Sequence, residues 1–467
     1  MPPIKDLQGP HVAVLVFPFG SHSLTILNLT LRLASAASSV HFSFLSTANS
    51  NASLLRTREL PSNIRAYDVD DGLPVNHATR GHSPEVVELF LEAAPVNLKR
   101  ALDTATSVTG RRINFLLTDL FLTLFAEEMA AELRVPWIPL CVAVPYDLSA
   151  HVYTDQIREQ FRNSDCSNGS ILEHRKLEFI PGLSPFSAID LPEGILPTDS
   201  EESLLASMLS KVGKILPKAA AIVMNFFQEL YSVPLRNDLY SLFPNLLNLG
   251  FLTVQLPPPP LPPSSSDETG CLSWLDSKNP KSVVYISFGT VAKLPSAELI
   301  ALAEALEETE TSFLWVLDRN SQQFLPIGFL ENARSSGKIV SWAPQRQVLR
   351  HPSTGVFITH AGANSVFESI ACEVPMICRP FFGDHRINGR LVEEVWGIGV
   401  GVEGLVLTKS GVAKSLNLFL GDEEGKKMRQ RIQLLNRIVL EAAGPNGSAT
   451  QDFKALVELI ILKLPKL

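Results

Sequence analysis

The sequence has little cysteine and no excess of positive charge. Only five of its 467 residues are cysteine, and no two of them form a C-x-x-C pair. A disulfide framework and a zinc site are therefore both disfavoured, and a reducing compartment is the simpler expectation. Forty Lys and Arg residues against forty-eight Asp and Glu residues give a formal net charge of −8. This charge provides no basic field that would attract nucleic acid or anionic lipid.

Long hydrophobic runs are also missing. The first apolar run, residues 12–19, lacks the charged front and the cleavage site of a signal peptide. A second run, residues 456–464, is interrupted by Glu458 and Lys463 and is far shorter than the ~20 residues needed to cross a bilayer. We therefore expect no membrane span and a cytoplasmic protein. What is present, 45% hydrophobic and 19% charged residues, is typical of a folded globular chain.

Strand-like and helix-like segments alternate through the first half of the chain. Continuous apolar runs typical of buried strands are separated by segments with helical spacing, and they lie at residues 11–19, 40–47, 113–118, 137–144 and 221–227. This alternation predicts βαβ units in a mostly parallel sheet. The functional loops of such a sheet lie at the carboxyl ends of its strands.

A proline-rich segment divides the chain, because residues 256–263 contain six prolines. After it the alternation resumes, with strands predicted at 282–290, 313–318, 338–342, 355–360 and 375–382 and helices at 296–309 and 365–371. We therefore predict an α/β protein with two doubly wound, Rossmann-like domains that face each other across a cleft. The predicted parts are an N-terminal domain (1–250), a linker (251–270), a C-terminal domain (271–445) and a tail (446–467).

The most informative segment surrounds His360. A predicted strand ends at this residue, a tight turn follows over residues 361–364, and a helix is expected to begin near Ser365. Unpaired backbone N–H groups and the positive end of the helix would then converge on one point, which favours a phosphate. His360 and Ser365 add donors, and Glu368 is placed to accept from ribose hydroxyls. The alternative is that Asn364 or Ser365 merely caps the helix.

Residues 342–385 form a 44-residue segment that reads WAPQRQVLRHPSTGVFITHAGANSVFESIACEVPMICRPFFGDH. In its length, its W-A-P-Q opening, its His-x-Gly-x-Asn-Ser core, its glutamate and its P-F-F-G-D ending, it resembles the signature box of plant secondary-product UDP-glycosyltransferases. The resemblance extends over essentially the whole chain and is nearest to the flavonoid 3-O-glycosyltransferase branch, judged by HVAVLVFPFGSH and RPFFGDHRINGR. It implies a GT-B type fold in which the tail packs back on the N-terminal domain.

The resemblance also implies where a UDP-sugar, the co-substrate, would bind. Trp342 would stack on uracil, with the Ala343 backbone reading the edge of the base and Gln345 nearby, and Glu368 would hold the ribose. The other donor contacts it implies are His360, Gly362, Ala363, Asn364, Ser365 and Thr290 for the diphosphate, and Asp384 and His385 for the sugar. Taken alone, Trp342 would be a core aromatic and Asp384 a turn residue. No metal is implied.

Two features of the box depart from its relatives. Ala361 and Ala363 stand where most relatives carry Cys and Trp, which predicts a looser donor pocket. A weakly active or non-catalytic protein that binds nucleotide sugar or flavonoid is the alternative. His385 stands where glucosyltransferases usually carry Gln, and it resembles the galactose-using members. Glucose and galactose differ in one hydroxyl, so one or two hydrogen bonds, each worth roughly 0.5–1.5 kcal/mol, would separate them. We expect UDP-galactose, with UDP-glucose as the alternative.

His22 and Asp119 follow two of the predicted parallel strands, so both open onto the same sheet edge. An Asp-oriented imidazole is geometrically reasonable there. The resemblance matches His22 to the catalytic base and Asp119 to its partner. It implies a single in-line displacement that inverts the anomeric centre and needs no carboxylate nucleophile. The implied product is a flavonol or anthocyanidin carrying a β-linked hexose on its 3-hydroxyl, and the implied acceptor-binding residues are Gly20, Phe121, His151 and Phe382.

Two motifs point to other chemistry. Asp68-Val69-Asp70 looks like the D-x-D of metal-dependent transferases, but it lies near Gly72 and Pro74, and we expect a solvated loop. Residues 399–404 satisfy G-x-G-x-x-G but do not lead from a strand into a clear helix, so a nucleotide-dependent oxidoreductase remains a disfavoured alternative. We expect a monomer with a UDP-sugar and a flavonoid as its small-molecule partners, and no nucleic acid.

Overall fold

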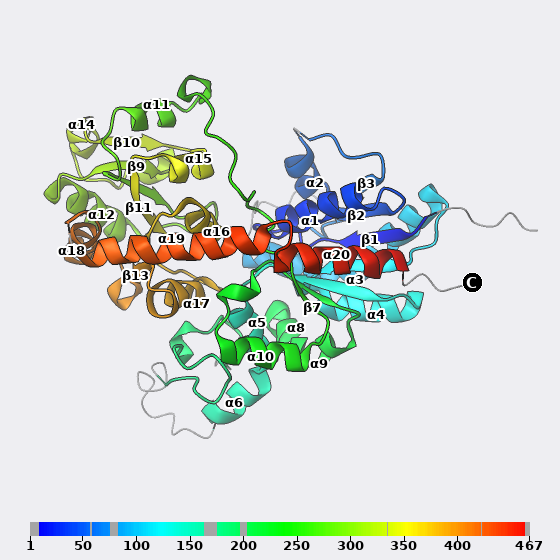
Figure 1. The fold of residues 1–467 in the computed structure, drawn as a ribbon. Helices are drawn as coiled ribbons and strands as arrows, with labels where there is room; N and C mark the ends of the chain where they lie inside the picture. Colours follow the sequence, from blue (N-terminus) through cyan, green and yellow to red (C-terminus); the bar gives the residue numbers. More distant parts are fainter. Residues whose placement is uncertain are drawn as a thin grey trace, which may run out of the picture.

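The computed structural model describes residues 9–56, 58–74, 83–162, 175–196, 203–333, 335–421 and 423–462. Two parallel sheets, each flanked by helices, form two halves that lie side by side (Figure 1). The first half precedes the proline-rich segment, and most of the second follows it. The boundaries of these halves as domains remain predictions from the sequence.

The sheet of the first half has seven strands in the order β3-β2-β1-β4-β5-β6-β7. The strands are β1 (His11–Leu15), β2 (His41–Thr47), β3 (Ile64–Val69), β4 (Phe115–Asp119), β5 (Trp137–Cys141), β6 (Ile222–Met224) and β7 (Leu246–Asn248). Every residue of β1, β4 and β5 is buried, which explains why these strands read as continuous apolar runs. The strand order reverses at β1, which pairs in parallel with both β2 and β4. A crevice for a ligand is expected at this reversal.

Helices cover both faces of this sheet and produce two hydrophobic clusters, one on each face. The helices of the first half are α1 (His22–Ala36), α2 (Ala48–Leu55), α3 (Pro84–Thr109), α4 (Thr123–Leu133), α5 (Pro145–Val152), α6 (Thr154–Arg162), α8 (Leu204–Leu209), α9 (Val212–Ile215) and α10 (Val233–Leu242). Helix α1 begins two residues after Gly20, whose left-handed φ of 57° makes the turn out of the first strand.

The sheet of the second half has six parallel strands in the order β10-β9-β8-β11-β12-β13. They are β8 (Val283–Ser287), β9 (Ser312–Val316), β10 (Gly337–Val340), β11 (Thr354–Thr359), β12 (Met376–Cys378) and β13 (Gly399–Gly401). The strand order reverses at β8, which pairs with β9 and β11. The loops after β8 and β11 therefore open at the second crevice.

The helices of the second half follow the same alternation. They are α11 (Cys271–Asp276), α12 (Ser296–Glu308), α13 (Arg319–Gln322), α14 (Phe329–Asn332), α15 (Gln345–Arg350), α16 (Ala363–Cys372), α17 (His385–Arg390), α18 (Lys409–Gly421) and α19 (Glu423–Ala443). Short 3-10 turns lie at Leu120–Leu122, Ala188–Asp190, Leu216–Lys218, Gln228–Leu230, Ser264–Ser266 and Glu403–Leu405, and a π-helical turn lies at Leu391–Val395.

The start of the predicted linker is buried between the two halves. Phe251 is only 3% exposed, and its ring stacks on that of Phe367 in α16 with centroids 4.1 Å apart. The prolines that follow, residues 257–260, are half-buried or exposed. The passage between the halves therefore begins as packed structure and becomes an open connector only at the prolines.

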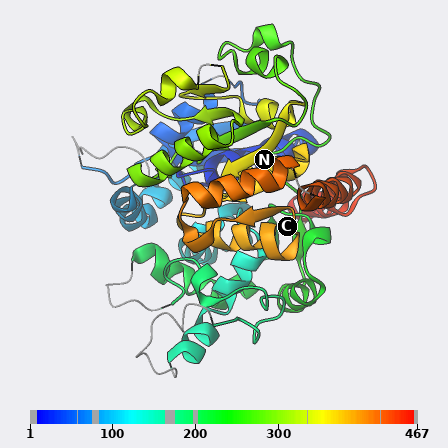
Figure 2. The same ribbon diagram turned by 90° about the vertical axis from the view of Figure 1, so that its left-hand side faces the viewer.

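The last two helices join the halves. Helix α19 packs against α16, and after a short turn α20 (Ser448–Leu462) crosses to β7 of the first half. The backbone N–H of Asn248 donates to Asp452 Oδ2 at 2.7 Å, and Leu456 is fully buried in the hydrophobic cluster of the first sheet. Figure 1 shows the pair lying end to end along the molecule, and Figure 2 views them end-on at one side. No helix within the described ranges is long and apolar enough to cross a membrane.

Candidate active site

The first residue of α1 and the last residue of β4 form a histidine–aspartate pair. His22 Nδ1 lies 2.8 Å from Asp119 Oδ2, and the other oxygen of Asp119 accepts from the backbone N–H of Phe121 at 2.9 Å. Asp119 is fully buried, whereas the His22 side chain is 15% exposed. The carboxylate therefore holds the proton of His22 on Nδ1 and leaves Nε2 as a nitrogen with a free lone pair.

Aromatic rings surround this pair. His22 lies 4.6 Å from the ring of Phe121 and 5.1 Å from the ring of Phe17, measured between centroids. Phe19 and Phe90 extend the cluster, with 5.5 Å between their centroids. The sequence predicted only Phe121 for this wall. Phe17 and Phe19 were overlooked because they end an apolar strand, although two aromatics next to the Gly20 turn were a usable signal.

Helix α5 carries the other histidine of the first half that was predicted for the site. His151 is 4% exposed, and burial lowers its pKa to about 4, so the ring is neutral. Its Nδ1 is enclosed and has no hydrogen-bond partner among the described residues. Its Nε2 lies 3.8 Å from Asp147 Oδ2. Phe382, the acceptor-binding residue predicted from the second half, is 43% exposed and lies against the ring of His385.

The predicted phosphate site is the amino end of α16. The helix begins at Ala363, earlier than the expected start near Ser365, and its N-cap residue is Gly362, which has no side chain to cap it. The alternative that Asn364 or Ser365 merely caps the helix is therefore wrong. The first amides of α16 have no intrahelical partner and remain available to an anion. A Cβ on Gly362 would lie 2.4 Å from His360 Nε2, so glycine is needed for the close packing of this turn.

Asn364 has a partner that the sequence did not predict. Thr253, from the segment that leaves β7, donates its hydroxyl to Asn364 Oδ1 at 2.8 Å. The carbonyl oxygen of Thr253 in turn accepts from Arg346 of α15 at 3.4 Å. No sequence motif connects residues 111 positions apart, and only the packing of the two halves brings them together. The bond leaves the amide N–H₂ of Asn364 as its available donor.

The residues predicted for uridine lie beside α16. Trp342 is 64% exposed, so the alternative that it is a core aromatic is wrong, while Ala343 is buried. Gln345 Nε2 donates to Glu368 Oε2 at 2.7 Å and Gln345 Oε1 accepts from the hydroxyl of Tyr285 at 3.1 Å. Burial raises the pKa of Glu368. Tyr285, inside β8, gives no signal in the sequence beyond that of a buried strand residue.

Two neutral histidines connect the predicted diphosphate and sugar contacts. The rings of His360 and His385 meet edge to face at 4.8 Å. Burial, and then His385, lowers the pKa of His360 to about 3, and burial lowers the pKa of His385 to about 4. The loop of Thr290 lies against the same ring, because a Cβ on Gly289 would be 3.0 Å from His360 Cε1. Thr290 itself is exposed.

Asp384 links the two halves electrostatically. Burial raises its pKa, and the hydrogen bond from Asn388 at 2.9 Å and the ring of His22 oppose that rise. Asp384 is the N-cap residue of α17 and is more than a turn residue, because the histidine of the opposite half influences its pKa. Its neighbour Gly383 donates its N–H across the cleft to Glu193 at 2.7 Å.

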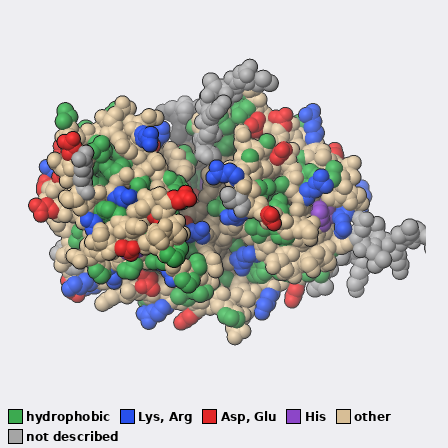
Figure 3. All heavy atoms as spheres, turned by 90° about the horizontal axis from the view of Figure 1, so that it is seen from above, with side chains coloured by type: hydrophobic (Ala, Val, Ile, Leu, Met, Phe, Trp, Pro, Cys, Tyr) green, Lys and Arg blue, Asp and Glu red, His purple; other side chains and the backbone are tan. Residues whose placement is uncertain are grey.

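A cavity of about 590 Å³ lies between the halves. Residues of both halves line it, among them Asn28 and Arg32 of α1, Thr253, and the donor-site residues Asn364 and Glu368. Seen from above, the surface is hollowed between the two lobes, and acidic and basic side chains are interspersed around it (Figure 3). The cavity adjoins the predicted ribose and phosphate contacts.

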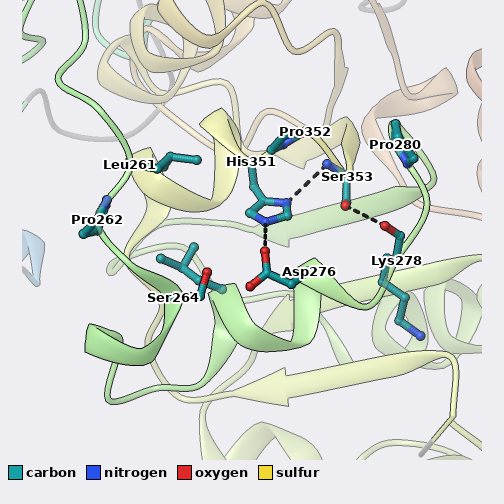
Figure 4. Close-up of a pocket in the computed structure, with 10 residues that line it drawn as sticks. Leu261, Pro262, Ser264, Asp276, Lys278, Pro280, His351, Pro352 and Ser353 are labelled. Carbon is teal, nitrogen blue, oxygen red and sulfur yellow. Dashed lines mark hydrogen bonds and ion pairs between the residues drawn. The ribbon is translucent and has the colours of Figure 1, made fainter.

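A second histidine–aspartate pair lies in a separate pocket of about 440 Å³ in the second half (Figure 4). His351 Nε2 is 3.1 Å from Asp276 Oδ1, and its Nδ1 accepts from the backbone N–H of Ser353 at 3.2 Å. The hydroxyl of Ser353 donates to the carbonyl of Lys278 at 2.9 Å. Both nitrogens of His351 are therefore occupied, which leaves this pair a structural one, unlike His22 and Asp119.

The structure shows the local conformation of the two motifs that point to other chemistry. Asp68 is inside β3 and accepts from Asn51 at 2.8 Å, so the expectation of a loop holds only for Asp70, which accepts from Gly72. Residues 399–404 run from β13 into a 3-10 turn and not into an α-helix. Among the described residues, no group of three His, Cys, Asp or Glu side chains is arranged to hold a metal ion.

Comparison with known proteins agrees with this geometry. The profile of the family described as UDP-glucoronosyl and UDP-glucosyl transferase matches residues 261–438. An anthocyanidin 3-O-glucosyltransferase of Vitis vinifera is 45% identical over 458 residues, with 98% of each chain covered. An anthocyanidin 3-O-galactosyltransferase of Rhododendron delavayi is 46% identical and covers 96% of this chain and 97% of its own.

A crystal structure of a UDP-glucose: anthocyanidin 3-O-glucosyltransferase in complex with UDP has the same fold. Its TM-score is 0.90 at 42% identity, with 98% of this chain and 99% of that chain covered. The predicted fold class, two doubly wound sheets of the GT-B type, is thereby confirmed. The class is that of an enzyme that transfers sugar from a nucleotide. The chain belongs to the plant UDP-glycosyltransferase family, and its co-substrate is a UDP-sugar.

Proposed function

We propose that the protein transfers a hexose from a UDP-sugar to the 3-hydroxyl of a flavonol or anthocyanidin and gives a β-glycoside. The observation that carries the proposal is the 2.8 Å pair of His22 and Asp119, whose histidine opposes the rise in the pKa of Asp384 in the other half. The names of the relatives, which are anthocyanidin and flavonol 3-O-glycosyltransferases, support the acceptor class.

The reaction begins with the acceptor hydroxyl at His22. Its Nε2 takes the proton of the hydroxyl, and Asp119 stabilises the imidazolium that forms. The oxygen attacks the anomeric carbon from the side opposite UDP, so an α-linked sugar becomes β-linked. The proton stays on His22 until product leaves.

Charge that develops on the departing UDP is met by groups of the second half. The amides at the start of α16 and the amide of Asn364 donate to the diphosphate, and Ser365, Thr290 and neutral His360 add donors. The backbone N–H donors of residues 361 and 363 are present with alanine just as with a larger side chain. The aromatic wall of Phe17, Phe19, Phe90 and Phe121 suits a planar polyphenol.

Galactose is the hexose we propose for the donor. His385 is neutral and 8% exposed, and its ring is fixed between His360 and Phe382. Each nitrogen of a neutral imidazole offers either a donor or an acceptor to a ligand, whereas a glutamine amide presents a donor and an acceptor side by side. Relatives at similar identity include both glucosyl- and galactosyltransferases, so their names do not decide between the two hexoses. The experiment below compares the two donors directly.

The experiment combines quercetin and cyanidin with UDP-galactose, UDP-glucose and a UDP-pentose, and NMR determines the linkage of each product. We expect a 3-O-β-galactoside as the main product and a higher kcat/KM for UDP-galactose. We also expect the His385→Gln variant to shift the kcat/KM ratio toward UDP-glucose by about tenfold, the value of one hydrogen bond.

Other outcomes decide between the alternatives. A higher kcat/KM for UDP-glucose in the unmodified protein would refute the galactose proposal and leave the transferase proposal intact. Binding of UDP and of quercetin without any product would indicate a non-catalytic binding protein. Consumption of NADPH in place of UDP-sugar would indicate an oxidoreductase.

A further inference from the structure

The loop before α17 is bound to the first half by a hydrogen bond that the proposed chemistry does not use. The backbone N–H of Gly383 donates to Glu193 Oε2 at 2.7 Å, a distance typical of a charge-assisted bond. Gly383 directly precedes Asp384 and His385, the residues predicted to contact the sugar. Glu193 follows the 3-10 turn Ala188–Asp190, which belongs to the first half. The bond therefore links the predicted sugar contacts to the half that contains the proposed catalytic base.

Helix α17 packs against the same 3-10 turn and adds two contacts between the halves. Arg386 donates to the carbonyl oxygen of Ile189 at 3.0 Å, and Arg390 Nη2 lies 3.3 Å from Asp190 Oδ1. Asp190 is itself fixed, because its Oδ2 accepts from the backbone N–H and the hydroxyl of Ser187 at 2.9 Å and 3.0 Å. The Asp190 side chain is only 6% exposed, so solvent screens its ion pair less than an exposed one. The segment that carries the glutamate is therefore anchored to α17 as well.

The other side of the loop is tied to the predicted phosphate site. Asn388 of α17 is 1% exposed and donates from Nδ2 to Asp384 Oδ2 and to the carbonyl oxygen of Ala361, each at 2.9 Å. Ala361 belongs to the turn before α16. By contrast, a Cβ built on Gly383 would meet no described atom beyond its chain neighbours within 4 Å, so side-chain packing does not fix the loop there. The hydrogen bond to Glu193 is what holds this side of the loop.

We propose that Glu193 is a positioning residue for sugar transfer. Its carboxylate holds the loop of Asp384 and His385 at a fixed place against the first half, so that the hexose bound by this loop meets the acceptor oxygen at His22. Glu193 acts through the loop and not by contact with a substrate. The inference rests on the proposed function in taking Asp384 and His385 as sugar contacts.

The first measurement needs no flavonoid. Calorimetry gives the Kd of UDP and of UDP-galactose for the unmodified protein, Glu193→Ala and Glu193→Gln. Alanine removes the acceptor of the hydrogen bond, whereas glutamine keeps a carbonyl oxygen and removes the charge. Because Glu193 is exposed, its truncation should leave the fold intact. The control is Glu132→Ala, because Glu132 is 59% exposed and pairs with Lys99 within the first half.

Two further measurements report the bond and its effect on the reaction. Hydrogen exchange of a peptide that contains Gly383, followed by mass spectrometry, shows whether the backbone N–H has lost its partner. Steady-state kinetics with quercetin and UDP-galactose give kcat for the same variants.

We expect Glu193→Ala to raise the Kd of UDP-galactose about three- to tenfold, the value of one hydrogen bond, while the Kd of UDP changes less than about twofold. The peptide that contains Gly383 should exchange faster in this variant. The kcat should fall about tenfold or more, because a displacement of about 1 Å can lower a rate by about 10²-fold. Glu193→Gln should recover most of these losses, and Glu132→Ala should resemble the unmodified protein.

Three results would overturn the proposal. The first is a Kd of UDP that rises as much as that of UDP-galactose in Glu193→Ala, which would indicate a general structural role. The second is an unchanged Kd of UDP-galactose and an unchanged kcat, whether or not the peptide that contains Gly383 exchanges faster. The third is an equal loss in Glu193→Gln, which would assign the effect to the charge of Glu193. Because calorimetry and exchange need no flavonoid, a failure of the unmodified protein to glycosylate quercetin would count against the proposed function alone.

Discussion

At the scale of single residues, the chemistry of the cleft depends on which polar atoms already have partners. His22 and His351 each pair with an aspartate, at 2.8 Å and 3.1 Å. The second nitrogen of His351 is occupied by a backbone N–H, whereas His22 keeps Nε2 open beside the aromatic wall. Only the pair in the cleft can therefore exchange a proton with a substrate.

We expect His22→Ala to lower kcat by about 10²–10⁴-fold, because general-base catalysis contributes that much. The KM for the UDP-sugar should change little, since His22 belongs to the acceptor half. Asp119→Asn should also lower kcat, because the amide would donate to Nδ1 and leave the proton on Nε2. Steady-state kinetics check both variants.

The control is His351→Asn, which should lower thermal stability and leave kcat unchanged at temperatures where the variant is folded. Retention of full kcat in His22→Ala would contradict the assignment of the base.

A substitution of Ala361 tests whether the backbone of the turn before α16 is strained. It is fully buried with a left-handed φ of 61°, a conformation that costs a residue with a Cβ about 1–2 kcal/mol. Ala361→Gly should therefore raise the free energy of unfolding by about 0.5–1 kcal/mol, after the greater chain entropy of unfolded glycine is subtracted. Denaturant titration measures the change.

A matched substitution lies two residues further on. Ala363→Gly, in the first turn of α16, should lower the free energy of unfolding by up to about 1 kcal/mol. Glycine is less favourable than alanine at a residue with ordinary helical backbone angles. Destabilisation by both substitutions would show that the left-handed turn is not strained.

At the scale of elements, the sequence predicted the central strands and missed strands near the edges. The apolar runs at 11–19, 113–118 and 137–144 contain β1, β4 and β5, which are buried on both faces. The missed strands have weaker signals. The edge strand β3 mixes buried and exposed residues and so forms no continuous apolar run, and β7 and β13 have only three residues each. Pairing with a neighbour forms these short strands, and their own sequences do not reveal it.

In the candidate site, too, local sequence signals predicted some residues and missed others. The signature box is contiguous in the sequence, so the residues from Trp342 to His385 were predicted together. Thr253 was not predicted, because it belongs to a distant segment and meets the box only when the two halves pack. The roles of the predicted residues stay predictions until ligands are bound.

The bond between Thr253 and Asn364 gives a prediction at this scale. Thr253→Val keeps the shape of the side chain and removes the hydroxyl, so the Asn364 amide loses its fixed orientation. We expect the KM for the UDP-sugar to rise about three- to tenfold with little change in kcat, the value of one hydrogen bond. Initial-rate kinetics at saturating acceptor measure both constants.

Thr253→Ser restores the hydroxyl and should restore KM. An equal rise of KM in Thr253→Ser would show that packing of the methyl group, and not the hydrogen bond, carries the effect.

At the scale of the whole molecule, the two halves are joined by elements far apart in the sequence. Phe251 stacks on Phe367, Gly383 donates to Glu193, and α20 returns the end of the chain to β7 of the first half. Helix α20, at the end of the described chain, therefore contributes to the core of the first half. A core substitution in α20 should destabilise the first half, although the nearest segments in the chain belong to the second.

Leu456→Ala tests this consequence. Leu456 is fully buried in the cluster beneath the first sheet, and truncation of a buried leucine costs about 2–5 kcal/mol. UDP at about 100 times its Kd stabilises the half that binds it by about 2.7 kcal/mol. In Leu456→Ala with UDP, calorimetry should therefore resolve two unfolding transitions, the lower one insensitive to UDP. Leu434→Ala, at a 51% exposed position of α19, should unfold like the unmodified protein. A single transition that UDP shifts as a whole would mean that the two halves unfold as one cooperative unit.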